Sequence, residues 1–208
     1  MKNVLLVGDS VRLGYQARVA ELLGEDVTVY APPENCRYTK YALWGMYTYM
    51  EMWGHPKLDV IHWNTGAWDL HRCTADGEIF TPLDEYLAVN RRLAIQMESY
   101  CKNLIWATIT PGNRHLDEQK ALNSLINTDA EFTKAFLCDT MEKWNADVLR
   151  YNKANSEQLA ARGIRINDLC SLILKDTDRY ISDDGIHPSE EGYELLARQV
   201  AEQIKAML

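Results

Sequence analysis

The sequence has no long run of apolar residues and no small-residue cleavage site near its N-terminus. Met1, Lys2 and Asn3 lead directly into a short apolar segment. A secretion signal would need both features, so we expect the chain as given to lack one. We therefore expect a cytoplasmic protein, with a trimmed secreted protein as the alternative. The sequence also contains no internal repeat, low-complexity tract or linker.

Cysteine is scarce and poorly placed for a structural role. The cysteines are Cys36, Cys73, Cys101, Cys138 and Cys170. Their odd number, wide spacing and lack of a C-x-x-C motif suggest neither a disulfide framework nor a zinc site. His62, His71 and Cys73 lie close together in sequence but match no common ligand pattern. We expect no metal.

Positive charge is in deficit, with 22 Lys and Arg against 30 Asp and Glu and a formal net charge of -8. Nucleic acids and anionic membranes would repel such a protein, so we expect neither as a partner. A neutral small molecule or glycan fits better. The 208 residues, 47% of them hydrophobic, suit a single folded domain over 1–208. The sequence does not indicate the oligomeric state.

Short apolar runs alternate with segments of helical spacing. The runs, each bounded by turn-forming or charged residues, are 4–7, 27–30, 59–63, 104–109 and 164–166. The helical segments are 11–23, 39–53, 83–101 and 143–161, and a last helix starts at Ser189 with Leu195, Leu196, Val200 and Ile204 on one face. This alternation predicts an α/β protein with a three-layer α/β/α architecture and a doubly wound parallel sheet of about five strands.

One stretch, 111–140, breaks the alternation. It has mixed polarity and is too long for an ordinary connection between a strand and a helix. We expect it to form a partly helical cap or insertion over the site.

Two motifs near opposite ends of the chain carry chemistry. Gly8-Asp9-Ser10 directly follows the first apolar run, and Asp184-Gly185-Ile186-His187 precedes the last helix. A serine is a poor nucleophile unless a base removes its proton, and a histidine base works best when a carboxylate holds its ring. In an open parallel sheet, ligands bind beyond the carboxyl ends of the strands, so the two motifs can meet there.

Together with 33–37 and 64–69, these motifs resemble the sequence blocks of the SGNH/GDSL hydrolases, a family of esterases and lipases. The resemblance covers nearly the whole chain in the family's order, and it implies a flavodoxin-like fold and no cofactor. It makes Ser10 the nucleophile, His187 the general base and Asp184 the residue that orients the imidazole.

Simpler interpretations of these residues exist. Ser10 also suits the N-cap of the helix that follows it, and one residue can fill both roles. Without Ser10, turn chemistry would account for Asp184 and His187. Asp183 is an adjacent carboxylate, but the spacing of the family motif selects Asp184. Asp9 is expected to be structural, with its carboxylate accepting N–H groups of the turn.

The expected oxyanion hole departs from the family pattern. The family has G-x-N-D where this chain has Gly66-Ala67-Trp68-Asp69, so Trp68 replaces the usual asparagine. Asn64 lies two residues before Gly66, and we prefer it as the amide donor over a simple cap of the strand end. Cys36 stands where the second block usually has glycine, and its backbone N–H can still donate. The predicted donors are therefore Ser10 N–H, Cys36 N–H and the Asn64 amide.

Two further residues are predicted to bind substrate. Trp68 lies on a site loop and is expected to face the pocket. Arg37 either lines the pocket or pairs with an acidic neighbour. The resemblance predicts a serine esterase that works through an acyl-enzyme, with a short-chain (acetyl) ester on a carbohydrate as the leading substrate. The alternatives are a lysophospholipase or thioesterase, and a catalytically weak glycan-binding protein.

Overall fold

The structure is a computed structural model that describes residues 1–74, 76–113 and 140–208. The predicted cap or insertion over 111–140 lies outside the described residues except at its two ends. At the first end, the backbone N–H of Asn113 donates to the carbonyl of Gly185 at 2.9 Å. The start of this segment therefore contacts the loop that carries Asp184 and His187.

Within the described residues, the sheet has five strands in the order β2-β1-β3-β4-β5, and every neighbouring pair is parallel. This is the doubly wound order of flavodoxin-like folds. The predicted fold class is confirmed. The strands are β1 (Lys2–Gly8), β2 (Val27–Tyr30), β3 (Val60–Asn64), β4 (Leu104–Ala107) and β5 (Arg165–Asn167).

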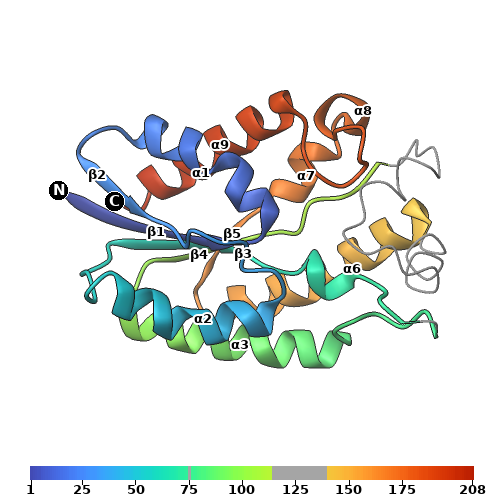
Figure 1. Cartoon of the computed structure of the whole chain (residues 1–208), viewed down its shortest axis with the longest axis horizontal. Helices are drawn as coiled ribbons and strands as arrows, with labels where there is room; N and C mark the ends of the chain where they lie inside the picture. The colour runs from blue at the N-terminus through green and yellow to red at the C-terminus, as the bar shows by residue number, and fades with distance from the viewer. Residues whose placement is uncertain (75, 114–139) are drawn as a thin grey trace.

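Helices cover both faces of the sheet, as Figure 1 shows. On one side lie α1 (Ser10–Leu23), α7 (Leu169–Ile173), α8 (Thr177–Tyr180) and α9 (Glu190–Lys205). On the other lie α2 (Thr39–Met52), α3 (Leu83–Tyr100) and α6 (Met141–Ala160). The sequence did not predict α7, α8 or the 3-10 turn η1 (Trp68–Leu70), because a few residues are too short to show a helical period.

The strands are apolar on both faces because both faces are covered. In β1, Leu5 and Val7 join the core under α2 and α3, whereas Val4 and Leu6 join the core under α1 and α9. Side chains alternate between the faces of a strand, so a strand with two covered faces is a continuous apolar run. This explains why the short runs of the sequence predicted the strands.

The last helix buries a narrower face than predicted. Leu196, Val200 and Ile204 are fully buried in the core with α1, whereas Leu195 is only half-buried. Residues four apart share one side of a helix, and Leu195 lies at the margin of that side.

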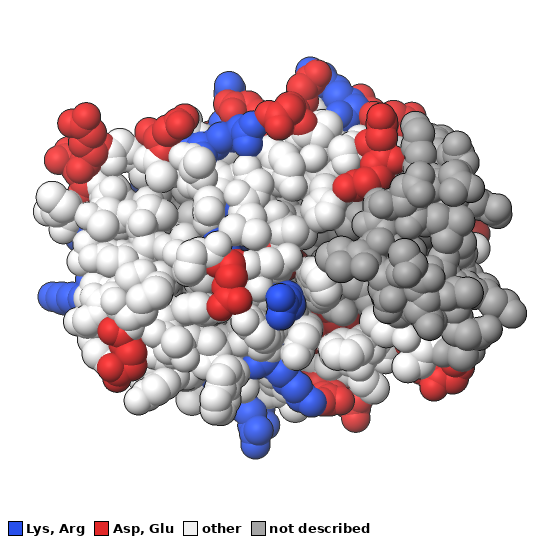
Figure 2. All heavy atoms as spheres, in the orientation of Figure 1, with Lys and Arg blue, Asp and Glu red and all other residues white. Residues whose placement is uncertain are grey.

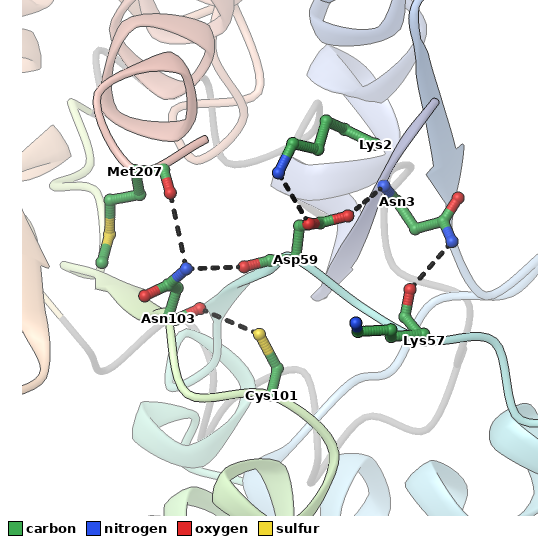
Figure 3. A network of polar contacts seen from close by, with 7 residues as sticks. All are labelled: Lys2, Asn3, Lys57, Asp59, Cys101, Asn103 and Met207. Atoms are coloured by element: carbon green, nitrogen blue, oxygen red, sulfur yellow. Dashed lines mark hydrogen bonds and ion pairs between the residues drawn. The ribbon is translucent and has the colours of Figure 1, made fainter.

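The amino-terminal edge of the sheet is closed by a polar network around Asp59 (Figure 3). Its carboxylate accepts hydrogen bonds from the Lys2 ammonium and the Asn3 backbone N–H, both at 2.9 Å. Its carbonyl accepts one from the Asn103 amide at 2.9 Å. The starts of β1, β3 and β4 are thereby tied together, and the opposite, carboxyl edge carries the candidate site.

The loop between α8 and α9 is anchored by a buried glycine. Gly192 lies in the first turn of α9, where its N–H donates to the hydroxyl of the N-cap residue Ser189 at 3.1 Å. A Cβ at Gly192 would lie 2.2 Å from the carbonyl oxygen of Tyr180 and 3.0 Å from the Cβ of Pro188. The absence of a side chain therefore allows α9 to start directly against the end of α8.

We expect Gly192→Ala to lower the free energy of unfolding by about 1–3 kcal/mol, the usual cost of overpacking a close contact. A loss of stability would be informative because helix propensity alone favours alanine over glycine by about 1 kcal/mol and would therefore raise the stability. Chemical denaturation measures the free energy of unfolding. The control is Glu202→Ala, at an exposed position of the same helix, and its stability should lie within about 0.5 kcal/mol of wild type. A Gly192→Ala protein as stable as the control would contradict this packing.

Candidate active site

The serine of the first motif is the first residue of α1, and the residue before it caps the helix. The Asp9 carboxylate accepts the backbone N–H of Val11 at 3.0 Å. The expectation that Ser10 could be the N-cap is therefore wrong, because Asp9 holds that position. Ser10 lies at a helix N-terminus, where the first backbone N–H groups have no partner within the helix and favour negative charge.

The structure brings Ser10, His187 and Asp184 into one line of hydrogen bonds. The Nε2 atom of His187 lies 2.8 Å from the Ser10 hydroxyl oxygen, and its Nδ1 atom lies 2.6 Å from Oδ2 of Asp184. A carboxylate only accepts, so Nδ1 carries the proton and Nε2 is left to accept the serine proton. Nucleophile, base and orienting carboxylate thus have the geometry that activates a serine.

The acid–base pair is held by its own turn. Oδ1 of Asp184 accepts the backbone N–H groups of Ile186 and His187, both at 2.8 Å. Gly185 lies in the left-handed region with φ of 76°, which favours glycine. Asp183 is exposed, and the bond to the ring comes from Asp184. The geometry therefore agrees with the choice that the motif spacing made between the two carboxylates.

The electrostatics of the pair follow from these contacts. Burial acts to raise the pKa of Asp184, but hydrogen bonds from the His187 ring and from two backbone N–H groups hold it well below its usual range. The hydrogen bond to Asp184 raises the pKa of His187, burial opposes this, and the charges of Asp184 and Asp9 add to the rise. Asp184 is therefore ionised at neutral pH, and His187 becomes neutral at a higher pH than an unpaired histidine.

Asn64, at the end of β3, lies beneath the first motif. It is buried, its Nδ2 donates to Oδ1 of Asp9 at 2.8 Å, and its Oδ1 accepts the hydroxyl of Tyr15 at 2.9 Å. An amide nitrogen has two hydrogens, so one remains for another acceptor. Burial raises the pKa of Asp9 to about 6, although the hydrogen bonds from Val11 and Asn64 act in the opposite direction. The role of Asn64 as an oxyanion donor stays a prediction.

The predicted donor Cys36 needs a correction. Its backbone N–H donates to the carbonyl of Gly8 at 3.0 Å, so this hydrogen already has a backbone partner and is not presented to a substrate. The glycine-like backbone lies one residue later, where Arg37 has φ of 48°. The Arg37 N–H donates to the side chain of Asn35 at 2.7 Å. Arg37, and not Cys36, therefore has the left-handed backbone that glycine adopts most readily.

Sequence reasoning missed Arg12, which holds the loop after β2 against the site. It is fully buried, and its guanidinium donates to the carbonyls of Gly8 at 3.1 Å, Pro32 at 2.8 Å and Glu34 at 2.5 Å. The available signal was its position among the apolar residues of α1 that face the core. A buried arginine with such a set of acceptors serves to fix chain segments relative to one another.

The two predicted substrate-binding residues lie on separate loops. Trp68 begins η1, is half-buried and lies edge-on to His71 with ring centroids 5.8 Å apart. Arg37 is exposed, and its guanidinium lies 5.2 Å from the ring centroid of Tyr41, whose hydroxyl donates to Glu34 at 2.6 Å. Arg37 thus lies near an acidic neighbour, and its contact with substrate stays a prediction.

A small pocket is lined by neighbours of Ser10 in the chain, although Ser10 itself is not among its lining residues. Asp9 and Val11, the residues on either side of Ser10, form part of its lining, together with Asn64, Ala67 and Ile109. Its volume of about 10 Å³ is close to the space that one water molecule needs. The pocket therefore has room for about one water molecule.

Three further observations concern other ligands. Within 1–74, 76–113 and 140–208, no group of three or more His, Cys, Asp or Glu could hold a metal ion. Among the described helices, none is long and apolar enough to cross a membrane. On the face shown in Figure 2, the lysines and arginines lie among acidic residues and do not form one basic patch.

The sequence matches no family model and no curated protein. Its structure, in contrast, matches solved structures over nearly its whole length. An acetylxylan esterase from Geobacillus stearothermophilus superposes with a TM-score of 0.71 at 17% identity, covering 98% of this chain and 94% of that one. A lipase/acylhydrolase from Enterococcus faecalis gives 0.64 at 20% identity, covering 99% and 96%.

A GDSL-like lipase from Bacteroides thetaiotaomicron gives a TM-score of 0.62 at 15% identity, covering 100% of this chain and 89% of that one. At these identities the likeness concerns the fold. The chain has the fold of the SGNH/GDSL hydrolases, as its motifs implied.

The coupling between Asp184 and His187 predicts the titration of the imidazole. In an NMR titration, the His187 ring should lose its proton above the ordinary histidine value of about 6.5. Asp184→Asn should lower this midpoint because the hydrogen bond to the carboxylate and its charge are lost, whereas Asp183→Asn should leave it unchanged. His62 is an internal control: it is fully buried, which lowers its pKa to about 3, so its ring should not titrate at neutral pH.

Equal midpoints in wild type and Asp184→Asn would show that the carboxylate does not hold the ring in solution.

Proposed function

We propose that this protein is a serine esterase that cleaves a short-chain carboxylic ester, with an acetylated carbohydrate as the substrate class. One observation carries the proposal: the Ser10 hydroxyl, the His187 ring and the Asp184 carboxylate form a continuous hydrogen-bonded line at the carboxyl edge of the sheet. This arrangement supplies a nucleophile and a base that is already in the correct tautomer.

In the first half of the reaction, Nε2 of His187 removes the proton of the Ser10 hydroxyl while the oxygen attacks the ester carbonyl carbon. The charged Asp184 stabilises the imidazolium that forms. The tetrahedral intermediate then expels the alcohol oxygen, which takes the proton from His187. The products of this half are the free alcohol and an acyl group on Ser10.

In the second half, His187 removes a proton from water, and the hydroxyl oxygen attacks the acyl carbonyl. Collapse of the second intermediate breaks the bond to Ser10, whose oxygen takes the proton from His187. The acid is released, and the serine is restored. No cofactor enters either half.

The negative oxygen of each intermediate needs donors. The backbone N–H of Ser10 lies at a helix N-terminus, and the Asn64 amide has a hydrogen beyond the one that Asp9 accepts. As a third donor we propose Arg37 N–H in place of Cys36 N–H. Its present acceptor is the side chain of Asn35, which can rotate away when substrate binds, whereas the Gly8 carbonyl that accepts from Cys36 is fixed in the backbone.

Aromatic rings on the site loops support the carbohydrate part of the proposal: Trp68 is half-buried, Phe80 is 49% exposed, and Tyr38 lies edge-on to Phe80 at 5.2 Å. Such rings can stack against the apolar faces of sugars. The acetylxylan esterase among the similar structures acts on a substrate of this kind.

The proposal predicts hydrolysis of nitrophenyl acetate and of acetylated xylose that depends on Ser10. Ser10→Ala should lower kcat by roughly 10³-fold or more, as removal of a triad nucleophile does elsewhere. Circular dichroism should show an unchanged fold, because only one hydroxyl is lost. Acetyl esters should be cleaved faster than octanoyl esters.

Two outcomes would point to the alternatives. Faster cleavage of octanoyl or thioester substrates would favour a lysophospholipase or a thioesterase. Binding of a glycan without turnover by the purified wild-type protein would favour a binding protein on the same fold.

The departure from the family motif gives a second prediction. Asn64→Ala should lower kcat by roughly 10²- to 10³-fold with little change in KM, because an oxyanion donor strengthens its bond as charge develops. Trp68→Phe keeps most of the bulk and removes the indole N–H, so it should act mainly on KM. Steady-state kinetics on an acetyl ester separate the two effects. The reverse pattern would assign the oxyanion contact to the indole of Trp68.

A further inference from the structure

A fully buried tyrosine, Tyr15, contacts the side-chain oxygen of Asn64, the predicted oxyanion donor. Tyr15 lies on α1, the helix that starts with the nucleophile, and its hydroxyl donates to Oδ1 of Asn64 at 2.9 Å. The Nδ2 of the same amide donates to Oδ1 of Asp9 at 2.8 Å. The two ends of the Asn64 side chain therefore have different partners, both supplied by the segment that carries Ser10.

These partners determine which way round the amide lies. The Tyr15 hydroxyl keeps its proton at all physiological pH values, because burial raises its pKa far above the ordinary range. It can therefore donate to a carbonyl oxygen. The Asp9 carboxylate, when ionised, can only accept. A flipped amide would place its oxygen against the oxygen of Asp9, with no hydrogen between them.

Asn64 is also placed where its orientation matters. It forms part of the lining of the small pocket together with Asp9 and Val11, the two neighbours of Ser10 in the chain. Its side chain passes so close to Gly8 that a Cβ there would lie 2.2 Å from the amide oxygen. The amide thus lies directly under the nucleophile motif, with little space to adopt other rotamers.

We propose that Tyr15 is a positioning residue for the reaction: its hydroxyl holds the oxygen of the Asn64 amide away from the site, so that the second hydrogen of Nδ2 is presented to the negative oxygen of the intermediate. This inference rests on the proposed function, and it assigns a task to a residue that never touches substrate.

The structure also offers a matched control. Tyr151 is equally buried, and its hydroxyl donates to the carbonyl of Thr81 at 2.9 Å, a contact that does not involve Asn64. Tyr15→Phe and Tyr151→Phe each remove one buried hydroxyl and one hydrogen bond. A merely structural role would give the two variants similar properties, measured as a lower Tm with unchanged kcat.

The kinetic test is a double-mutant cycle of wild type, Tyr15→Phe, Asn64→Ala and the combined variant, with an acetyl ester as substrate. Tyr15→Phe should lower kcat by roughly 3- to 100-fold, the usual range of coupling between residues in contact, with KM unchanged. In the Asn64→Ala background the same change should have no further effect on kcat, because no amide remains to be oriented. Tyr151→Phe should keep the wild-type kcat.

Multiplied losses of kcat in the combined variant would overturn the proposal, because the two residues would then act independently. The proposal would also be overturned if Tyr15→Phe had the same kcat as Tyr151→Phe. It would likewise fail if Asn64→Ala kept the wild-type kcat.

A second measurement does not depend on turnover. In ¹⁵N NMR spectra, the side-chain amide of Asn64, assigned by its loss in Asn64→Ala, should shift in Tyr15→Phe and stay in place in Tyr151→Phe. If the Asn64 signal shifts in Tyr15→Phe and not in Tyr151→Phe, but the wild-type protein cleaves no ester, the orienting contact holds and the proposed function fails. An Asn64 signal that Tyr15→Phe leaves unmoved would reject the orienting contact itself.

Discussion

The site depends on one register of the sheet, the pairing of Gly8 on β1 with Asn64 on β3. These are the last paired residues of the two strands, so the register places the start of α1 beside the end of β3. Because Gly8 has no side chain, the Asn64 amide can pass over it and reach Asp9. A shift of one residue would turn Asn64 to the other face and remove this contact. Ser10 is thus placed by backbone pairing as much as by its own motif.

The sequence predicted the fold and the pairing of Asp184 with His187 because both depend on local patterns. A strand covered on both faces is a plain apolar run, and the separation of Asp184 from His187 matches a turn that closes on itself through backbone N–H groups. The observed helices begin and end close to their predicted limits for the same reason. Ser10 and His187 are distant in sequence, but parallel strands bring their ends to one edge.

The details that the sequence did not predict are set by long-range backbone contacts. The proposed choice between Cys36 N–H and Arg37 N–H as an oxyanion donor depends on which of them donates to the Gly8 carbonyl. No residue pattern indicates this backbone contact. The positive φ of Arg37 is equally hidden, because arginine rarely adopts it. Arg12 donates to backbone carbonyls, and every residue has one. Its partners therefore could not be predicted from residue types. Short helices such as α7 and α8 escape prediction because they span about one turn.

The separation of the two motifs also bears on biosynthesis. Ser10 and His187 are 177 residues apart, and α9, which follows His187, packs on α1, which starts at Ser10. At ordinary rates of translation the ribosome adds His187 roughly 9 to 35 s after Ser10. During that interval the nascent chain carries Ser10 without the ring that its hydroxyl contacts in the folded protein. This hydrogen bond can therefore form only after nearly all of the given sequence has been synthesised.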